Sequence, residues 1–241
     1  MLNAAHLVFR ERYADAAVAF AAGSLIRGEG TAYSDLDLVV VFPTLPAAYR
    51  ESIRFQGLPV EVFVHDPETL EYFFVEMDVA SGIPALPQMV MEGQEVTGPT
   101  ELSGRLKARA TAIIGFGPPP LDRETERRRR YVLTDLLDDL RGWRSQGELM
   151  ACGARLFEEL ADYHLRAGGH WSARGKAILD ALRRADAELC PRYCAAFESL
   201  FRRNAIDPVV NLAEEILRPN GGLLFEGYRS DAPATWRTVP E

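Results

Sequence analysis

Hydrophobic and polar positions in the first hundred residues follow helical and strand periods in turn. A helical pattern covers residues 3–16, and an apolar run, "AAVAFAAGS", closes on Gly-Ser. The β-branched run "LDLVVVF" at 36–42 predicts a buried strand. Residues 51–66 hold two alternating segments about a Gly57-Leu58-Pro59 break, which predicts a hairpin or two adjacent strands.

The pattern then returns to helix. Asp66-Pro67 places a capping residue and a proline at the start of "PETLEYFFVEMDVA", which predicts a helix over 67–80. A second short helix and a terminal strand are expected within 85–99. Residues 1–100 therefore predict one α/β domain.

Strand patterns stop at Glu101. A Gly/Pro-rich connection lies at 113–122, and apolar residues spaced three and four apart follow it. This spacing predicts an antiparallel helical bundle over 101–218. Residues 219–241 form a tail with little periodicity. The spaced residues are Leu133, Leu136, Leu137, Leu140, Leu149, Cys152, Leu156, Leu160 and Tyr163, and further helices are expected at 172–185, 191–203 and 207–218.

Composition is that of an ordinary globular protein, with 47% apolar and 26% charged residues in 241. No uncharged apolar run approaches the ~20 residues of a membrane span, and the N-terminus is charged where a signal peptide is apolar, so we expect a cytoplasmic protein without a membrane partner. Cys152, Cys190 and Cys194 lack metal-binding spacing and are interpreted as reduced core thiols.

Charge is distributed unevenly. Residues 1–100 contain 5 basic and 14 acidic residues, and the remainder contains 22 basic and 21 acidic residues. This asymmetry indicates two units and disfavours long nucleic acid as a partner, because phosphate binding needs a basic surface. The run Arg127 to Arg130 follows three acids, so we interpret it as a solvated, ion-paired helix face.

Two carboxylates, Asp35 and Asp37, enter the buried strand at 36–42. Residues i and i+2 of a strand project from one face, and an unpaired buried carboxylate is costly, so a cation is expected between them. Glu61 interrupts "VEVFV" and faces them if its strand lies alongside. Three carboxylates without cysteine or clustered histidine form a hard oxygen site that suits Mg²⁺, and two such ions would support phosphoryl transfer.

Gly23 and Ser24 close the preceding apolar run, eleven residues before Asp35. Glycine lets a backbone approach a phosphate, and a hydroxyl at a helix start can bind an anion. Taken with the carboxylates, this segment predicts a nucleotide triphosphate site.

The segment "GSLIRGEGTAYSDLDLVVV" resembles the signature of the polymerase β-like nucleotidyltransferase superfamily, and Glu61 matches the position of its third acid. The resemblance covers about residues 17–66, and the trailing helices resemble the aminoglycoside and lincosamide nucleotidyltransferase branch. It implies an α/β domain with a mixed sheet followed by an all-α bundle.

The resemblance also implies a reaction. A nucleoside monophosphate would pass from an NTP, usually ATP, to a hydroxyl of a small molecule, with Mg²⁺ bound and pyrophosphate released. Asp35, Asp37 and Glu61 would bind the metals, and Gly23, Ser24 and Ser34 would hold the triphosphate. The helical bundle would bind the acceptor. An acidic cleft would favour a polycationic acceptor, such as an aminoglycoside antibiotic.

For several further residues the sequence allows more than one role. Arg27 matches an arginine of minimal nucleotidyltransferases or pairs with a nearby acid, and Lys176 either reaches the nucleotide phosphates or is a surface lysine. Glu158, Glu159 and Asp162 are candidate bases, although a solvated helix face is favoured.

Two other functions stay open. One is a protein-modifying AMP transferase of antitoxin type, against which the fused bundle counts. The other is a nucleotide-binding module without catalysis, against which the complete set of three acids counts. The acceptor, the choice of NTP and the oligomeric state do not follow from the sequence.

Overall fold

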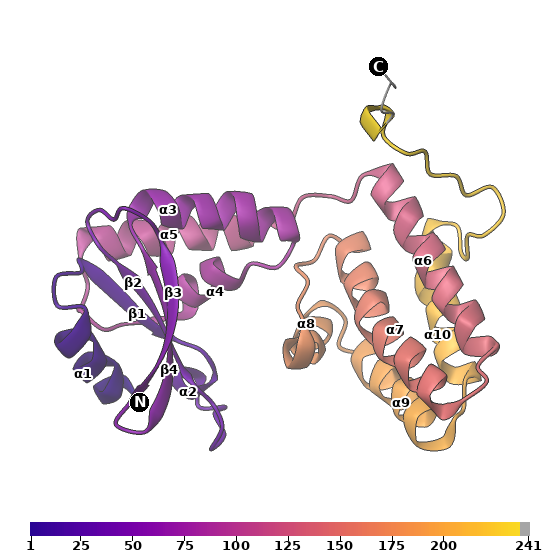
Figure 1. The fold of residues 1–241 in the computed structure, drawn as a ribbon, viewed down its shortest axis with the longest axis horizontal. Coiled ribbons are helices and arrows are strands. Elements are labelled where there is room, and N and C mark those ends of the chain that lie inside the picture. The colour runs from indigo at the N-terminus through magenta and orange to yellow at the C-terminus, as the bar shows by residue number, and fades with distance from the viewer. Residues whose placement is uncertain (237–241) are drawn as a thin grey trace. The chain divides into compact units, whose positions relative to one another are not determined.

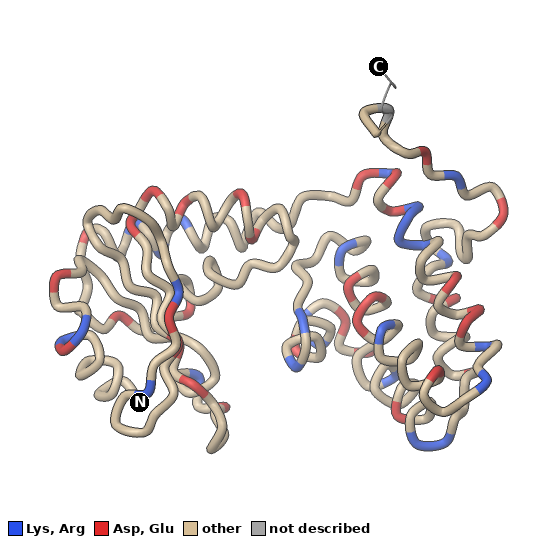
Figure 2. Tube along the Cα trace, viewed as in Figure 1, with Lys and Arg blue, Asp and Glu red and all other residues tan. Residues whose placement is uncertain are grey.

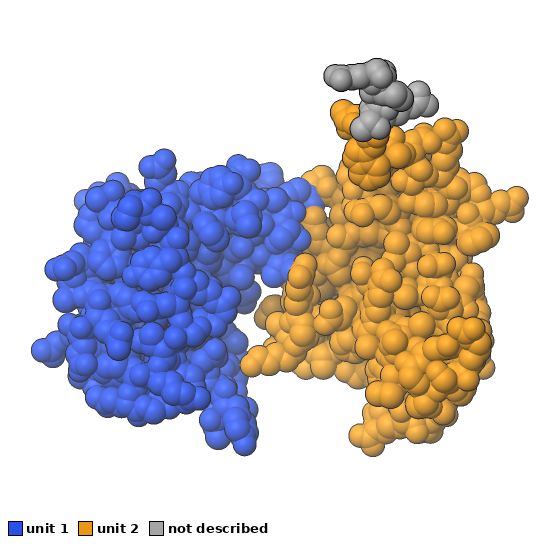
Figure 3. Space-filling view, in the orientation of Figure 1, with its two compact units in different colours: residues 1–119 blue, residues 120–241 orange. Residues whose placement is uncertain are grey.

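The structure, a computed structural model, describes residues 1–236, and its chain divides into two units after Pro119. Figure 3 colours the two units separately. The first contains every strand of the described chain, and the second consists of helices and the C-terminal segment (Figure 1). An α/β part followed by a helical part agrees with the expected fold class.

A five-stranded sheet forms the centre of the first unit. Its order is β3-β4-β2-β1-β5, with β2 and β4 parallel and the other neighbours antiparallel, so the expected mixed sheet is confirmed. The strands are β1 (Val18–Ala22), β2 (Leu36–Val41), β3 (Tyr49–Phe55), β4 (Leu58–His65) and β5 (Gln94–Glu95). The two segments about Gly57 are an antiparallel pair, β3 and β4.

The two faces of this sheet differ. Leu36, Leu38 and Val40 of β2 point to one face, where they share a core with Ala5 and Val8 of α1 (Leu2–Arg12). By the alternation of a strand, Asp37 and Val39 point to the opposite face. The helices that follow β4 lie along the sheet, with α4 (Ala85–Glu92) in contact with both β1 and β2. Asp37 therefore projects from the face of β2 that does not contribute to the core shared with α1.

The predicted helix over 67–80 is present in two parts, α3 (Pro67–Tyr72) and a π-helical segment η1 (Phe73–Val79). Its start was predicted correctly, since the carboxylate of Asp66 accepts a hydrogen bond from the Thr69 amide at 2.8 Å. The first helix is shorter than the predicted 3–16, because α1 ends at Arg12.

Helix α5 (Glu101–Phe116) packs with the sheet unit. Lys107 donates a hydrogen bond to the Gly93 carbonyl at 2.7 Å, and Ser103 donates one to Glu95 at 2.8 Å. The unit therefore runs to Pro119, whereas the sequence placed the domain boundary after residue 100 and a connection at 113–122. The loss of strand pattern at Glu101 marks the end of the sheet and not the end of the unit.

The second unit is built on the predicted apolar spacing. The leucines at 133, 136, 137, 140, 149, 156 and 160 are all buried in one core with Tyr163. Its helices are α6 (Arg123–Arg141), α7 (Gln146–Ala167), η2 (Gly175–Ala177), α8 (Ile178–Ala185), α9 (Leu189–Arg203), α10 (Asp207–Leu217), η3 (Arg218–Asn220) and η4 (Ala234–Trp236). The three cysteines carry free thiols, with Cys190 buried and the other two half-buried.

The C-terminal segment lies along α6. Arg130 donates a hydrogen bond to the Gly222 carbonyl at 2.9 Å, and the Leu224 amide donates one to the Thr134 hydroxyl at 2.9 Å. The rings of Tyr131 and Tyr228 stack with centroids 4.1 Å apart. Part of the predicted tail is thus packed, and its last residues, 237–241, lie outside the described part of the chain.

Arg130 also corrects the interpretation of the arginine run. It is buried and binds the C-terminal segment, and so does not lie on a solvated face. Within residues 1–236, no helix combines the length and the apolar character needed to cross a membrane.

Candidate functional site

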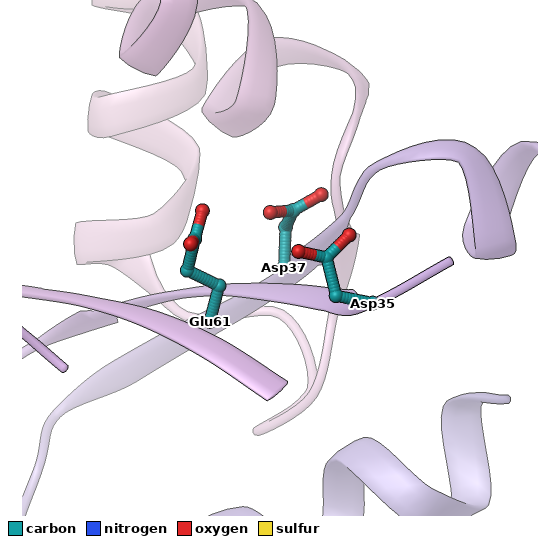
Figure 4. A group of neighbouring side chains, drawn as sticks. All are labelled: Asp35, Asp37 and Glu61. Carbon is teal, nitrogen blue, oxygen red and sulfur yellow. The ribbon is translucent and has the colours of Figure 1, made fainter. Parts of the chain in front are cut away.

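Three carboxylates meet at one edge of the sheet. Asp35, Asp37 and Glu61 each offer an oxygen, and these oxygens all lie within 4.8 Å of one another (Figure 4). Among the residues that the structure describes, they form the one such group of metal-ligating side chains. The three residues predicted from the sequence are therefore brought together.

Strand register explains this convergence. In the parallel pair of β2 and β4, Asp37 lies opposite Glu61, so the two side chains project from the same face. Asp35 precedes β2 by one residue and stands two positions before Asp37, on that same side. All three are half-buried, which limits the water available to solvate their charges.

The electrostatics of the group favour a bound cation. Burial, and after it the neighbouring charges of Asp35 and Glu61, together raise the pKa of Asp37 to about 6. Arg50 and Arg27 act against this shift but do not cancel it. Three hard oxygen donors with an excess of negative charge fit a divalent cation such as Mg²⁺.

Arg50 is a site residue that the sequence analysis missed. It stands on β3 opposite Phe63, two residues from the position opposite Glu61, and its guanidinium forms an ion pair with Glu61 while lying 5.0 Å from the centre of the Phe63 ring. Diagonal neighbours on adjacent strands are within reach of a long side chain. The sequence pattern carried no signal for this contact, because it depends on the register of β3 against β4.

Gly23 lies directly against the acidic group. Its φ is +82°, and a Cβ at this position would stand 2.0 Å from the Oδ2 atom of Asp37. Only glycine adopts this conformation without strain and leaves room for the carboxylate. The chain between β1 and α2 (Ser24–Arg27) therefore passes directly beside Asp37, with no room for a side chain between them.

Ser24 and Ser34 lie together next to this turn. The Ser24 hydroxyl donates a hydrogen bond to the Ser34 hydroxyl at 3.3 Å, and the Thr31 amide donates one to Ser34 at 2.9 Å. Ser34 is buried, so it holds the segment 28–34 in place, while Ser24 is half-buried. Both are thereby positioned beside the Gly23 turn that borders Asp37.

Arg27 lies at the end of α2 and pairs with acids. Its Nε atom is 2.9 Å from Glu29, and its Nη1 atom is 3.7 Å from Glu92 of α4. Its charge also lowers the pKa of Asp37, which places it near the acidic group. Both alternatives drawn from the sequence are thus compatible with its surroundings.

The remaining candidates lie in the second unit. Lys176 is exposed on η2, and its role toward the nucleotide stays a prediction. On α7, Asp162 forms an ion pair with Arg129, and Glu159 lies 3.9 Å from Arg155. Glu158 is exposed. The expected solvated face is thus met by Glu158, whereas Asp162 and Glu159 are half-buried and paired with arginines.

His65 is the last residue of β4. It is buried, packs edge-on against Phe73 with ring centroids 4.9 Å apart, and burial lowers its pKa. A neutral buried imidazole in contact with an aromatic ring is part of the packing below the site.

No protein-family model matches this chain, and no curated protein matches it either. A solved structure from Exiguobacterium sibiricum 255-15, described as a nucleotidyltransferase-like protein, is similar to it at 15% identity with a TM-score of 0.44. The similarity covers 91% of this chain and 75% of that one.

Proposed function

We propose that this protein transfers a nucleoside monophosphate from an NTP, in the first instance ATP, to a hydroxyl of a small molecule and releases pyrophosphate. The observation that carries the proposal is the meeting of Asp35, Asp37 and Glu61 beside the Gly23 turn. The resemblance of the segment 23–41 to the nucleotidyltransferase signature supports the same reaction class.

Asp35, Asp37 and Glu61 would hold two Mg²⁺ ions, since the donor set is all carboxylate and excess negative charge is concentrated there. Bound ions would supply neutralisation of the phosphate charge and a lowered pKa for the attacking hydroxyl. The three carboxylates would determine the positions of the bound ions at the ends of the strands.

Residues of the turn would bind the nucleotide. Gly23 lets the backbone of the turn lie directly against Asp37, and the hydroxyls of Ser24 and Ser34 are donors within the same turn. Arg27 supplies a guanidinium that can exchange its exposed partner Glu29 for a phosphate. The acceptor oxygen would then bond to the α-phosphorus as the bond to the pyrophosphate oxygen breaks, and the hydroxyl proton would be released to solvent.

The acceptor is proposed to be a small hydroxylated molecule bound with the help of the helical unit. The sheet unit, residues 1–119, carries 8 basic and 15 acidic residues, which favours a cationic acceptor by attraction. Aminoglycoside-like antibiotics are one class of that kind. Lys176 is retained in this proposal as a ligand of the nucleotide phosphates.

The experiment is incubation of the protein with Mg-ATP and libraries of hydroxylated acceptors, antibiotics included, followed by mass spectrometry and a pyrophosphate assay. We expect one acceptor to gain the mass of one AMP, and this gain to be absent with Asp37→Asn. Glu76→Gln removes an exposed acid of the same unit and should leave transfer unchanged.

Two outcomes would contradict the proposal. Folded protein that releases no pyrophosphate across the panel would indicate a nucleotide-binding module without catalysis. AMP found on a protein instead of a small molecule would indicate the protein-modifying alternative.

A further inference from the structure

The second unit contains a pocket that the proposed reaction does not use. Its volume is about 250 Å³, and it lies between the first turns of α6 and the C-terminal segment. Figure 2 shows basic residues concentrated in the first turns of α6. The lining residues are Arg123, Glu124, Arg127, Arg128, Tyr228, Arg229 and Ser230.

The wall of the pocket is held in place by specific contacts. Arg127 donates a hydrogen bond to the Gly227 carbonyl at 3.1 Å, and the ring of Tyr228 stacks on Tyr131 at 4.1 Å with an angle of 11° between the planes. These contacts fix residues 227 and 228 against the helix, so the pocket is a formed feature of the fold. The ring face of Tyr228 away from Tyr131 is not covered by that stacking.

Charge in the pocket is strongly unbalanced. Four guanidinium groups line it against one carboxylate, that of Glu124. Arg229 is neutralised by Asp231 at 2.7 Å, but within residues 1–236 neither Arg123 nor Arg128 has an ion-pair partner. Most other exposed arginines of this unit do have one, among them Arg155, Arg183, Arg192 and Arg202.

Unpaired guanidinium groups on a concave wall suit a ligand with several adjacent negative charges. Arg123 and Arg127 stand four residues apart on α6, so they share one helix face. Guanidinium binds phosphate oxygens in pairs, whereas the N-terminus of α6 is already capped by the Asp122 carboxylate, which accepts a hydrogen bond from the Thr125 amide at 2.8 Å. A single phosphate would leave part of this charge unused, whereas a chain of two or three phosphates would not.

We infer that this pocket binds an oligophosphate chain, either free or as part of a nucleotide. Arg123, Arg127 and Arg128 hold the phosphates, and the hydroxyls of Tyr228 and Ser230 are further donors. Glu124 opposes binding and limits the affinity. A small anion is favoured over nucleic acid because the unit as a whole carries no excess of basic residues, with 19 against 20 acidic ones.

The test is calorimetric titration of the full chain with inorganic tripolyphosphate, after passage over a chelating resin. Without divalent metal the carboxylates Asp35, Asp37 and Glu61 repel a polyanion, so the binding measured reports the pocket. We expect one site per chain, with an affinity that falls as salt is added. In the double variant Arg123→Gln, Arg128→Gln, affinity should fall about tenfold or more.

Matched variants separate this site from general attraction. Arg155→Gln with Arg202→Gln removes the same charge from the surface of the same unit and should leave the affinity unchanged. Glu124→Gln should tighten binding about threefold, because it removes the one carboxylate of the wall. Arg123, Glu124, Arg128, Arg155 and Arg202 are all exposed, so their substitution should leave the fold intact, and circular dichroism checks that each variant is folded.

Parallel titrations identify the source of the phosphates. If ATP and tripolyphosphate bind with equal affinity, the pocket recognises the phosphate chain alone. If ATP binds more tightly, the pocket also recognises the base, which would stack on the ring of Tyr228. The inference is overturned if wild-type protein binds no tripolyphosphate, if both double variants lose it equally, or if orthophosphate or a short single-stranded RNA binds more tightly.

Discussion

Asp37 belongs to the acidic group of the site, and its ionised carboxylate lowers the stability of the metal-free protein. Its pKa is raised to about 6 because it is half-buried between Asp35 and Glu61. A carboxyl group whose pKa is higher in the folded than in the unfolded state, where it is near 3.8, contributes stability below that value. This contribution is lost as the pH rises through about 6, so at neutral pH the metal-free site destabilises the protein.

Asp37→Asn is therefore expected to stabilise the metal-free protein while abolishing transfer. At pH 7.5 the free energy of unfolding should rise by about 1 kcal/mol, which is less than the full value of the pKa shift because the group is partly solvated. Urea unfolding from pH 4 to 8 measures this.

The same series has an internal comparison. The variant should lose the decline in stability between pH 4 and 7 that Asp37 causes, while keeping the decline that Asp78 causes, since burial also raises the pKa of Asp78 to about 6. Equal pH profiles for wild type and Asp37→Asn would contradict the account of this carboxylate.

Gly23 tests the geometry of the same site. Gly23→Ala introduces both backbone strain and a Cβ 2.0 Å from the Oδ2 atom of Asp37. Gly28→Ala is a matched control, because Gly28 has a similar φ of +79° but no atom within 4 Å of its added Cβ. Both variants should lose stability, on the order of 1 kcal/mol from strain alone.

Only Gly23→Ala should also displace Asp37 and weaken binding of Mn²⁺ about tenfold or more, measured by calorimetry. If the two glycine variants bind Mn²⁺ equally, then the close approach of the Gly23 backbone has no part in shaping the metal site.

At the scale of elements, pairing of neighbouring strands builds the site. Asp35 and Asp37 were recognisable in the sequence because carboxylates at the start of an apolar run break its pattern, and Glu61 broke the pattern of β4 in the same way. Arg50 was not recognisable, since an arginine in an exposed edge strand breaks no pattern. Its contact with Glu61 depends on the β3-β4 register, which the sequence left open between a hairpin and two adjacent strands.

Local signals also explain which boundaries were predicted. Asp66 and Pro67 predicted the start of α3, because Asp is a common N-cap residue and Pro is common at the first helical position. In the structure Asp66 is the N-cap of α3. Helix α5 carried no such information about its partner: its pattern is helical, but its contacts to Gly93 and Glu95 belong to the sheet unit. Periodicity predicts whether a segment is a helix or a strand, but it does not predict which unit that segment packs against.

Arg50 is expected to compete with metal for Glu61. Arg50→Ala frees the Glu61 carboxylate and removes a positive charge, so affinity for Mg²⁺ should rise severalfold. Arg54→Ala, two positions beyond the residue opposite Glu61 on the same exposed strand, has no ion pair with Glu61 and should change affinity less. Calorimetric titration with MgCl₂ compares them, and a lower affinity in Arg50→Ala would show that the ion pair positions Glu61 for metal instead of competing with it.

At the scale of the whole molecule, the two units divide the chemistry by charge. Residues 1–119 carry the acidic excess and the three carboxylates, and residues from Pro120 on are nearly neutral with a local pocket of arginines. The first arrangement suits a divalent cation and the second an anion. The sequence presented the arginine run as a solvated, ion-paired face. In the structure Arg127 and Arg128 line that pocket, Arg129 forms an ion pair with Asp162, and the buried Arg130 holds the C-terminal segment.

The central claim is that Asp35, Asp37 and Glu61 together form a divalent metal centre, and titration of the protein with Mn²⁺ by electron paramagnetic resonance tests it most directly. Wild-type protein and Glu76→Gln should bind Mn²⁺ saturably with equal affinity, and Asp37→Asn should bind it at least about tenfold more weakly while remaining folded. Equal Mn²⁺ binding by wild type and Asp37→Asn, or no saturable binding by the wild type, would contradict the account.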